Sequence, residues 1–225
     1  MGDVLHAMPA VAALREKHAE WFIGWVVEPR WSSLLQAGAA MPLVNRIYLA
    51  ATREWKARPF SVETIGDIAS LRRELRGERF DLCVDMQGSV RSAVIGRMAG
   101  ARRFVGSASP REGVARWLYS EPAAVRAAHV VEQGCELLGG AVGEVLRPAR
   151  VELPADEDAE QACEAMLARM GLRGEGFVML APTAGWGAKH WPAERFGAVA
   201  AELGETIMPP TEEVVTTAEN QEQVA

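Results

Sequence analysis

The amino-acid sequence predicts an α/β protein with a Rossmann-like layout. Short apolar segments alternate along the chain with segments that have helical periodicity. These apolar segments are short and mostly hydrophobic, and their alternation with helices is typical of parallel strands covered on both faces. The chain has 225 residues, of which 49% are hydrophobic, so it can bury one core and a second, smaller one.

Each expected element follows from its local pattern. The first strand is a run of aromatic and β-branched residues, and the later strands are shorter apolar runs. The helices repeat apolar residues at helical spacing. In chain order, the pattern predicts a helix at 10–18, strands at 21–27 and 46–49, a helix at 65–76, a strand at 80–85, a helix at 90–99, a strand at 102–105, helices at 128–138 and 159–170, a strand at 177–181 and a helix at 193–203.

The chain is expected to contain two domains and a tail. Residues 1–153 form the first Rossmann-like domain, Pro154–Asp158 is the best linker, and residues 154–204 begin a second domain. Residues 205–225 are rich in Thr, Glu and Gln and lack aromatic residues, so a disordered or atypical tail is expected. A doubly wound domain normally opens with a strand, whereas this chain runs from Met1 almost directly into a helical pattern. The first strand is therefore expected to be missing.

Composition and charge exclude several classes of protein. Lys and Arg number 24 against 30 Asp and Glu, and the net charge of −6 disfavours general nucleic-acid binding. The three cysteines, Cys83, Cys135 and Cys163, are widely spaced, which predicts buried free thiols rather than disulfides or metal ligands. No apolar run of about 18 residues and no leader sequence are found. The expectation is a cytoplasmic protein whose contact with a membrane is peripheral.

The segment Gly2-Asp3-Val4-Leu5-His6-Ala7-Met8-Pro9 places a carboxylate at the start of the first helix. One interpretation is that Asp3 caps the helix and that Pro9 stands at its first position or at a kink. The other is that Asp3 lies at the carboxyl edge of the sheet, where open α/β proteins bind ligands, and serves as a general base.

Two loops carry further polar candidates. After the strand that ends at Asp85, Gly88 allows a tight turn, and Gln87 offers a donor and an acceptor to a sugar hydroxyl, although an ordinary strand–turn–helix connection explains this loop equally well. In the second loop, Thr183 and Lys189 precede a helix start and suit a phosphate. This segment lacks the spacing of a P-loop, and an ordinary connecting loop is the alternative.

Basic residues suggest a third kind of contact. Arg53, Lys56 and Arg111 either lie on solvated loops or hold an anionic acceptor through charge-assisted hydrogen bonds. His129 and Glu132 lie one helical turn apart without a third ligand, so no metal site is predicted.

In their order along residues 1–204, these segments resemble the ADP-heptose:lipopolysaccharide heptosyltransferases, the type I branch of glycosyltransferase family 9. Four segments carry the resemblance: Gly2–Ala10, Val84–Gly88 with Arg91-Ser92-Ala93, Arg111-Glu112 through Trp117-Leu118-Tyr119, and the Thr183 loop with Lys189-His190-Trp191-Pro192.

The resemblance implies a GT-B fold, with an acceptor-side domain at 1–153 and the opening of the nucleotide-sugar domain at 154–204. It implies an inverting, metal-independent transfer of heptose from ADP-heptose to the Kdo inner core on lipid A at the inner membrane, with no cofactor. By the same resemblance, Asp3 is the base. Donor-binding residues would be Thr183 and Lys189, and acceptor-binding residues would be Arg53, Lys56, Gln87, Gly88 and Arg111.

The chain departs from the family pattern at both ends. The strand before Gly2 is missing, and the region that would follow Leu203, with most of the adenine pocket, is not recognisable. Two alternatives stay open. One is a catalytically inactive fragment of such an enzyme. The other is a different GT-B protein or a sugar-nucleotide epimerase relative, which would not be expected to combine Gly2-Asp3 with Gln87-Gly88.

Overall fold

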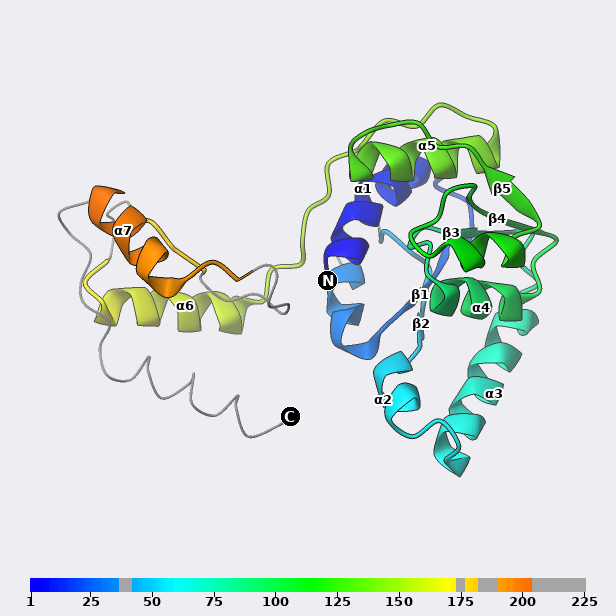
Figure 1. The fold of residues 1–225 in the computed structure, drawn as a ribbon, viewed down its shortest axis with the longest axis horizontal. Coiled ribbons are helices and arrows are strands. Elements are labelled where there is room, and N and C mark those ends of the chain that lie inside the picture. The colour runs from blue at the N-terminus through cyan, green and yellow to red at the C-terminus, as the bar shows by residue number, and fades with distance from the viewer. Residues whose placement is uncertain (37–41, 173–176, 182–189, 204–225) are drawn as a thin grey trace. The chain divides into compact units, whose positions relative to one another are not determined.

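The structure is a computed structural model that describes residues 1–36, 42–172, 177–181 and 190–203. The chain divides into two compact units, Met1–Asp156 and Glu157–Ala225. Both units are drawn in Figure 1.

The first unit contains two parallel sheets. In the first sheet, β1 (Gly24–Val27) pairs with β2 (Arg46–Leu49). In the second, β4 (Arg103–Ser107) lies between β3 (Leu82–Asp85) and β5 (Glu121–Ala123). The sequence predicted a parallel sheet, and the structure has two, both with parallel pairing. No strand in the described part of the chain pairs with both β1 and β3, so no strand pairing connects the two sheets.

Helices cover both faces of these sheets, with α1 packed along α5 (Figure 1). Helix α3 packs against α4, and the 3₁₀ helix η2 contacts α4. The helices of this unit are α1 (Gly2–Lys17), η1 (Pro29–Gln36), α2 (Thr52–Ala57), α3 (Val62–Gly77), α4 (Val90–Ala99), η2 (Gly113–Leu118) and α5 (Val130–Val142).

Strand β4 shows how the core is divided between the two faces. Successive side chains of a strand point to opposite faces. Accordingly, Phe104 packs with Ala93 of α4 and with Tyr119, and Val105 packs with Leu137 of α5. The Phe104 and Tyr119 rings meet edge to face with their centroids 5.2 Å apart. This strand is therefore the central element of a three-layer arrangement.

A polar cluster ties the end of α1 to the turn that follows α5. Lys17 Nζ lies 3.0 Å from Glu144 Oε2, and His18 Nε2 lies 2.5 Å from Glu144 Oε1. The hydrogen bonds from Lys17 and then from His18 lower the pKa of the Glu144 carboxyl below its ordinary value of 4.5. The folded chain therefore binds the Glu144 proton less tightly than the unfolded chain does.

This shift predicts a pH-dependent contribution of Glu144 to stability. Because the pKa is lower in the folded chain, the contribution is present above pH 4.5 and is lost as the pH falls through the folded-state value. Melting temperatures of the wild type and of Glu144→Gln should differ near neutral pH and converge in acid. Glu16→Gln, at an exposed position of α1, is the control. A difference between wild type and Glu144→Gln that grows in acid would contradict the prediction.

The second unit contains α6 (Glu157–Arg169) and α7 (Ala193–Leu203). Helix α6 includes the last two residues of the predicted linker, and Cys163 on this helix is exposed rather than buried. Residues 177–181 form no strand, so that prediction is wrong. A strand needs a neighbour for its backbone groups, and the described residues of this unit provide none.

Candidate functional site

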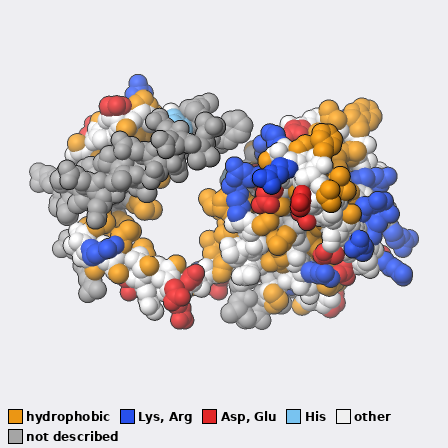
Figure 2. All heavy atoms as spheres, turned by 90° about the horizontal axis from the view of Figure 1, so that it is seen from below, with side chains coloured by type: hydrophobic (Ala, Val, Ile, Leu, Met, Phe, Trp, Pro, Cys, Tyr) orange, Lys and Arg blue, Asp and Glu red, His pale blue; other side chains and the backbone are white. Residues whose placement is uncertain are grey.

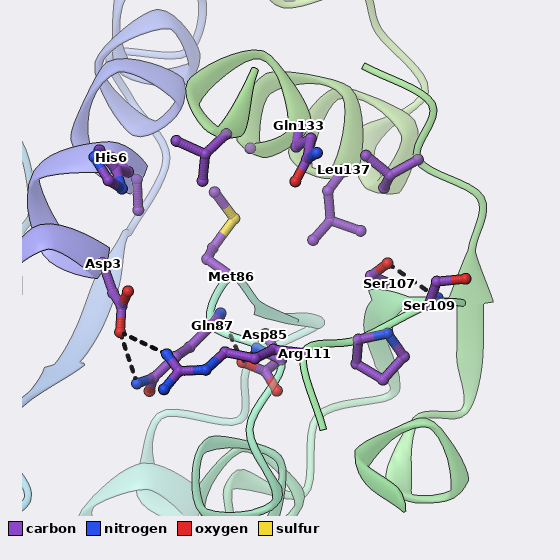
Figure 3. A pocket seen from close by; sticks show the side chains of 16 residues that line it. Asp3, His6, Asp85, Met86, Gln87, Ser107, Ser109, Arg111, Gln133 and Leu137 are labelled. Atoms are coloured by element: carbon purple, nitrogen blue, oxygen red, sulfur yellow. Dashed lines mark hydrogen bonds and ion pairs between the residues drawn. The ribbon is translucent and has the colours of Figure 1, made fainter. Parts of the chain in front are cut away.

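A cavity of about 430 Å³ opens at the carboxyl end of β3 in the first unit (Figure 3). Its walls come from the first turns of α1, the loop after β3, the loop after β4 and the first half of α5. Parallel sheets bind ligands at this edge because the loops that follow the strands converge there. The lining residues are Asp3, His6, Ala7, Asp85, Met86, Gln87, Gly88, Ser107, Ser109, Pro110, Arg111, Val125, Val130, Gln133, Gly134 and Leu137.

Asp3 lies in the first turn of α1, and its side chain is 53% exposed. The Gln87 side-chain amide donates to Asp3 Oδ2 over 3.0 Å, and Arg111 Nη1 lies 3.6 Å from the same oxygen (Figure 3). Asp3 Oδ1 has no hydrogen-bond partner among the described residues. One carboxylate oxygen is thus held and the other is available to accept a proton.

The helix-cap interpretation of Asp3 is wrong. The N-cap residue of α1 is Met1, and the described structure shows no side-chain hydrogen bond capping this end. Pro9 lies inside α1 rather than at its first position. Instead of capping its own helix, the Asp3 carboxylate accepts a hydrogen bond from a residue 84 positions further along the chain.

Gly88 allows two loops to approach each other closely. Its φ is +69°, a conformation that favours glycine. A Cβ at this position would lie only 3.0 Å from the backbone nitrogen of Arg111. The Glu112 N–H also donates to the Gly88 carbonyl over 2.9 Å. The loop that carries Gln87 and the loop that carries Arg111 are therefore joined directly.

The opposite wall of the cavity combines apolar and polar groups. Met86 and Leu137 point into the cavity together with Gln133, and Ser107 and Ser109 lie at its far side (Figure 3). Gln133 Nε2 donates to the Ala127 carbonyl over 2.9 Å. Apolar side chains beside hydroxyl and amide groups suit a ligand with one C–H face and several hydroxyls, as a sugar has.

The structure brings some of the predicted site residues together and leaves others apart. Asp3, Gln87, Gly88 and Arg111 all line the cavity. Arg53 and Lys56 lie on α2 and are not among its lining residues, so their contact with an acceptor stays a prediction.

The predicted donor-binding residues lie elsewhere in the chain. Thr183 and Lys189 both lie outside the described residues.

Sequence reasoning missed several lining residues. Ser107 is the last residue of β4 and lines the cavity. Gln87 was selected as a polar residue that follows a predicted strand, and the same reasoning would have selected Ser107. His6, Gln133 and Leu137 lie on helices, where the sequence does not show which side chains turn toward a ligand.

In the described residues, no three His, Cys, Asp or Glu side chains are placed to hold a metal ion. Among the helices described, none combines the length and the apolar character needed to cross a bilayer.

A methyl group added at Gly106, next to the cavity, is expected to destabilise the protein. A Cβ at this residue of β4 would overlap the ring of the buried Tyr119. Gly106→Ala should therefore displace the Tyr119 ring and lower the free energy of unfolding by roughly 1–3 kcal/mol, as overpacking does. Urea unfolding measures the change. Gly113→Ala is the control because nothing lies within 4 Å of a Cβ there. Equal loss in both variants would contradict this explanation.

Comparisons with known proteins point to one family. The family model described as glycosyltransferase family 9 (heptosyltransferase) matches residues 68–209. Lipopolysaccharide heptosyltransferase 1 of Escherichia coli K12 is 30% identical over 146 residues, which are 64% of this chain and 45% of that protein. The chain thus spans about half the length of such relatives.

Solved structures agree with this match in fold. The structure of E. coli heptosyltransferase WaaC with ADP aligns with a TM-score of 0.66 and 24% identity, over 91% of this chain and 62% of that one. WaaC with ADP-2-deoxy-2-fluoro heptose gives the same score and identity over 91% and 63%. At this identity the likeness concerns the fold alone, which is part of a GT-B fold.

Proposed function

Because this chain belongs to glycosyltransferase family 9, the heptosyltransferase family, we propose that it acts in the transfer of heptose from ADP-heptose to the Kdo inner core of lipopolysaccharide. The observation that carries the proposal is the pairing of Asp3 with Gln87 and Arg111 at the mouth of a cavity that suits a sugar. Since the chain spans less than two thirds of its relatives, its own turnover is part of the proposal.

In the proposed reaction Asp3 is the general base. An acceptor hydroxyl in the cavity gives its proton to Asp3 Oδ1, which has no other partner in the described structure. The acceptor oxygen then forms a bond to the anomeric carbon of heptose while the bond from that carbon to the ADP oxygen breaks. Attack opposite to the departing ADP inverts the anomeric carbon. The step needs a positioned base rather than a metal ion.

Arg111 is the proposed contact for the negative charge of the acceptor. Its side chain is 63% exposed, so the guanidinium can reach a ligand while it remains near Asp3. Kdo is a sugar acid, and a guanidinium binds a carboxylate through two parallel hydrogen bonds. The apolar side chains of Met86 and Leu137 would then meet the C–H face of the sugar ring.

The donor side of the proposal is supported by the relatives. WaaC has been solved with ADP and with an ADP-heptose analogue. We extend this donor to the present chain, with Thr183 and Lys189 as the residues that would hold its phosphates. Because lipid A is anchored in a bilayer, the proposal places the protein in the cytoplasm, in peripheral contact with the inner membrane. It includes neither a cofactor nor a nucleic-acid partner.

The direct test measures ADP release by the purified chain. ADP-heptose and a Kdo-bearing lipid A are supplied together, and the mass of the lipid product is recorded. ADP and a heptosylated lipid should appear only when both substrates are present. Reactions without acceptor, and with UDP-glucose as donor, are the controls. Absence of ADP and of product in the complete reaction would refute the proposed activity.

A second test addresses acceptor binding without turnover. Arg111→Ala should weaken binding of the Kdo-bearing acceptor about tenfold, because one charge-assisted contact is worth about 1.5 kcal/mol. Calorimetric titration of the acceptor into each variant gives the dissociation constants. Arg72→Ala, at an exposed position of α3, is the matched control and should bind like the wild type. Unchanged affinity in Arg111→Ala would remove this residue from the acceptor site.

A further inference from the structure

A buried carboxylate is connected to the proposed base through Gln87. Asp85 ends β3 and is only 6% exposed. Its Oδ1 accepts hydrogen bonds from the backbone N–H groups of Gln87 and Gly88, over 3.0 and 3.1 Å. Its Oδ2 accepts from Ser92 Oγ over 3.0 Å and from the Tyr119 hydroxyl over 2.8 Å. Four donors from the loop after β3, from α4 and from the end of η2 thus converge on one side chain.

Burial of a carboxylate is unfavourable unless donors replace the lost water. An apolar residue of similar size at the end of a strand would avoid that cost. The four hydrogen bonds compensate for the burial of the Asp85 carboxylate. They also fix the relative positions of the segments that supply the donors. The arrangement is therefore a geometric constraint on those segments.

The first constrained segment supports Gln87. Both backbone N–H groups that bind Asp85 Oδ1 belong to the turn that carries the Gln87 side chain, and that side chain donates to Asp3 Oδ2 over 3.0 Å. The Tyr119 hydroxyl ties the stretch that begins with Arg111 to the other oxygen of Asp85. Glu112 joins the two segments, because its carboxylate accepts from the Val90 N–H over 2.8 Å.

Asp3 needs such support because its own surroundings are open. It lies in the first turn of a helix and its side chain is about half exposed, with 53% of its surface accessible. The contacts to its Oδ2 come from Gln87 and Arg111, and both of these residues belong to segments held by Asp85. Displacement of either segment would change the direction in which Asp3 Oδ1 points.

We propose that Asp85 is a positioning residue for the reaction: through Gln87 and Arg111 it orients the Asp3 carboxylate toward the acceptor hydroxyl. This inference rests on the proposed function, in which Asp3 is the base. Asp85 itself is buried, and both of its oxygens are occupied by the protein, so it takes no part in proton transfer.

The kinetic test uses Asp85→Asn and Tyr119→Phe. Asparagine keeps an oxygen for the two N–H groups but replaces the acceptor of the Tyr119 hydroxyl by an NH₂ group. Asp85→Asn should lower kcat roughly 10- to 100-fold, as misplacement of a catalytic group does, and change the acceptor KM less than about threefold. Tyr119→Phe should lower kcat by a smaller factor. Tyr48→Phe removes the other tyrosine hydroxyl of the chain, outside the cavity, and should turn over like the wild type.

A double-variant cycle separates positioning from a general structural role. If Asp85 acts through Asp3, then Asp3→Asn with Asp85→Asn should be no slower than Asp3→Asn alone, within about twofold. Independent, multiplying effects of the two substitutions would overturn the proposal. Circular dichroism confirms that each variant is folded, and Tyr119→Phe provides the same cycle if Asp85→Asn does not fold.

A nuclear magnetic resonance measurement decides the proposal without turnover. The side-chain amide resonance of Gln87, identified by its absence in Gln87→Glu, should shift in Asp3→Ala because the hydrogen bond to the carboxylate is lost. It should shift in the same direction in Asp85→Asn. A Gln87 resonance unchanged by Asp85→Asn would overturn positioning. Failure of the wild-type chain to release ADP would instead refute the proposed function and leave this readout intact.

Discussion

Asp3→Asn is expected to lower the rate of heptosyl transfer by about 10²- to 10⁴-fold, the range that loss of a general base produces. Asparagine has nearly the shape of aspartate, so the turn of α1 and the contact with Gln87 can persist. The amide group cannot take the proton of the acceptor hydroxyl. The acceptor oxygen would then attack without losing its proton, which raises the barrier of the chemical step.

The measurement is the initial rate of ADP release at saturating concentrations of both substrates. Asp67→Asn is the matched control, because Asp67 is an exposed aspartate on α3 that does not line the cavity. Acceptor titration should give dissociation constants for Asp3→Asn within a few-fold of the wild type, since Arg111 remains. Wild-type turnover in Asp3→Asn would show that another group takes the proton.

Phe104→Ala is expected to give the largest loss of stability, about 3–5 kcal/mol in the free energy of unfolding. Phe104 is 2% exposed and contacts the Tyr119 ring, and the absence of a side chain at Gly96 makes room for its own ring. Truncation would leave a cavity between β4 and α4, because the glycine beneath offers nothing to fill it.

Urea unfolding followed by circular dichroism gives the value. Phe60→Ala is the matched control, since Phe60 is 92% exposed and should lose little stability. Because Tyr119 rests on Phe104, the transfer rate of the folded Phe104→Ala chain should fall as well. A loss no larger than that of Phe60→Ala would mean that the core between β4 and α4 relaxes around the missing ring.

Local signals explain where the sequence predicted the fold well. The helix expected at 90–99 is observed with those bounds because both of its ends are marked. Ser89 and Ser92 form a capping box at its start, and Gly100 adopts a left-handed conformation after its end. The strand at 46–49 is also observed as expected.

Elements without local signals were missed. Strand β5 contains Pro122, which argues against a strand unless the strand lies at a sheet edge, and β5 does lie at the edge of its sheet. Helix α2 has only six residues, too few for a helical repeat to be recognised. The first helix was expected at 10–18 and starts at Gly2, because Pro9 lies inside the helix and does not mark its first position.

The candidate site was predictable where topology alone determines proximity. Residues that follow parallel strands meet at one edge of the sheet, and Gln87 and Gly88, which follow β3, line the cavity at that edge. The approach of Arg111 to Asp3 depends instead on Gly88 and on the side chains around Asp85. Such contacts between segments distant in sequence are determined by tertiary packing, and no local pattern reports them.

The division of the first unit into two sheets affects its cooperativity. No strand pairing in the described part of the chain joins β1 to β3, so the two halves are coupled by side-chain packing. One apolar cluster contacts both sheets. It includes Val27 of the first sheet, and Val84 of the second sheet packs against it. Helix α1 contributes Met8, Val11 and Leu14 to this cluster. Apolar packing of this kind weakens on cooling and in denaturant, whereas a shared strand would add directional backbone bonds. The alignment of Asp3 with the loops of the second sheet consequently depends on how firmly α1 is seated between two independently hydrogen-bonded halves.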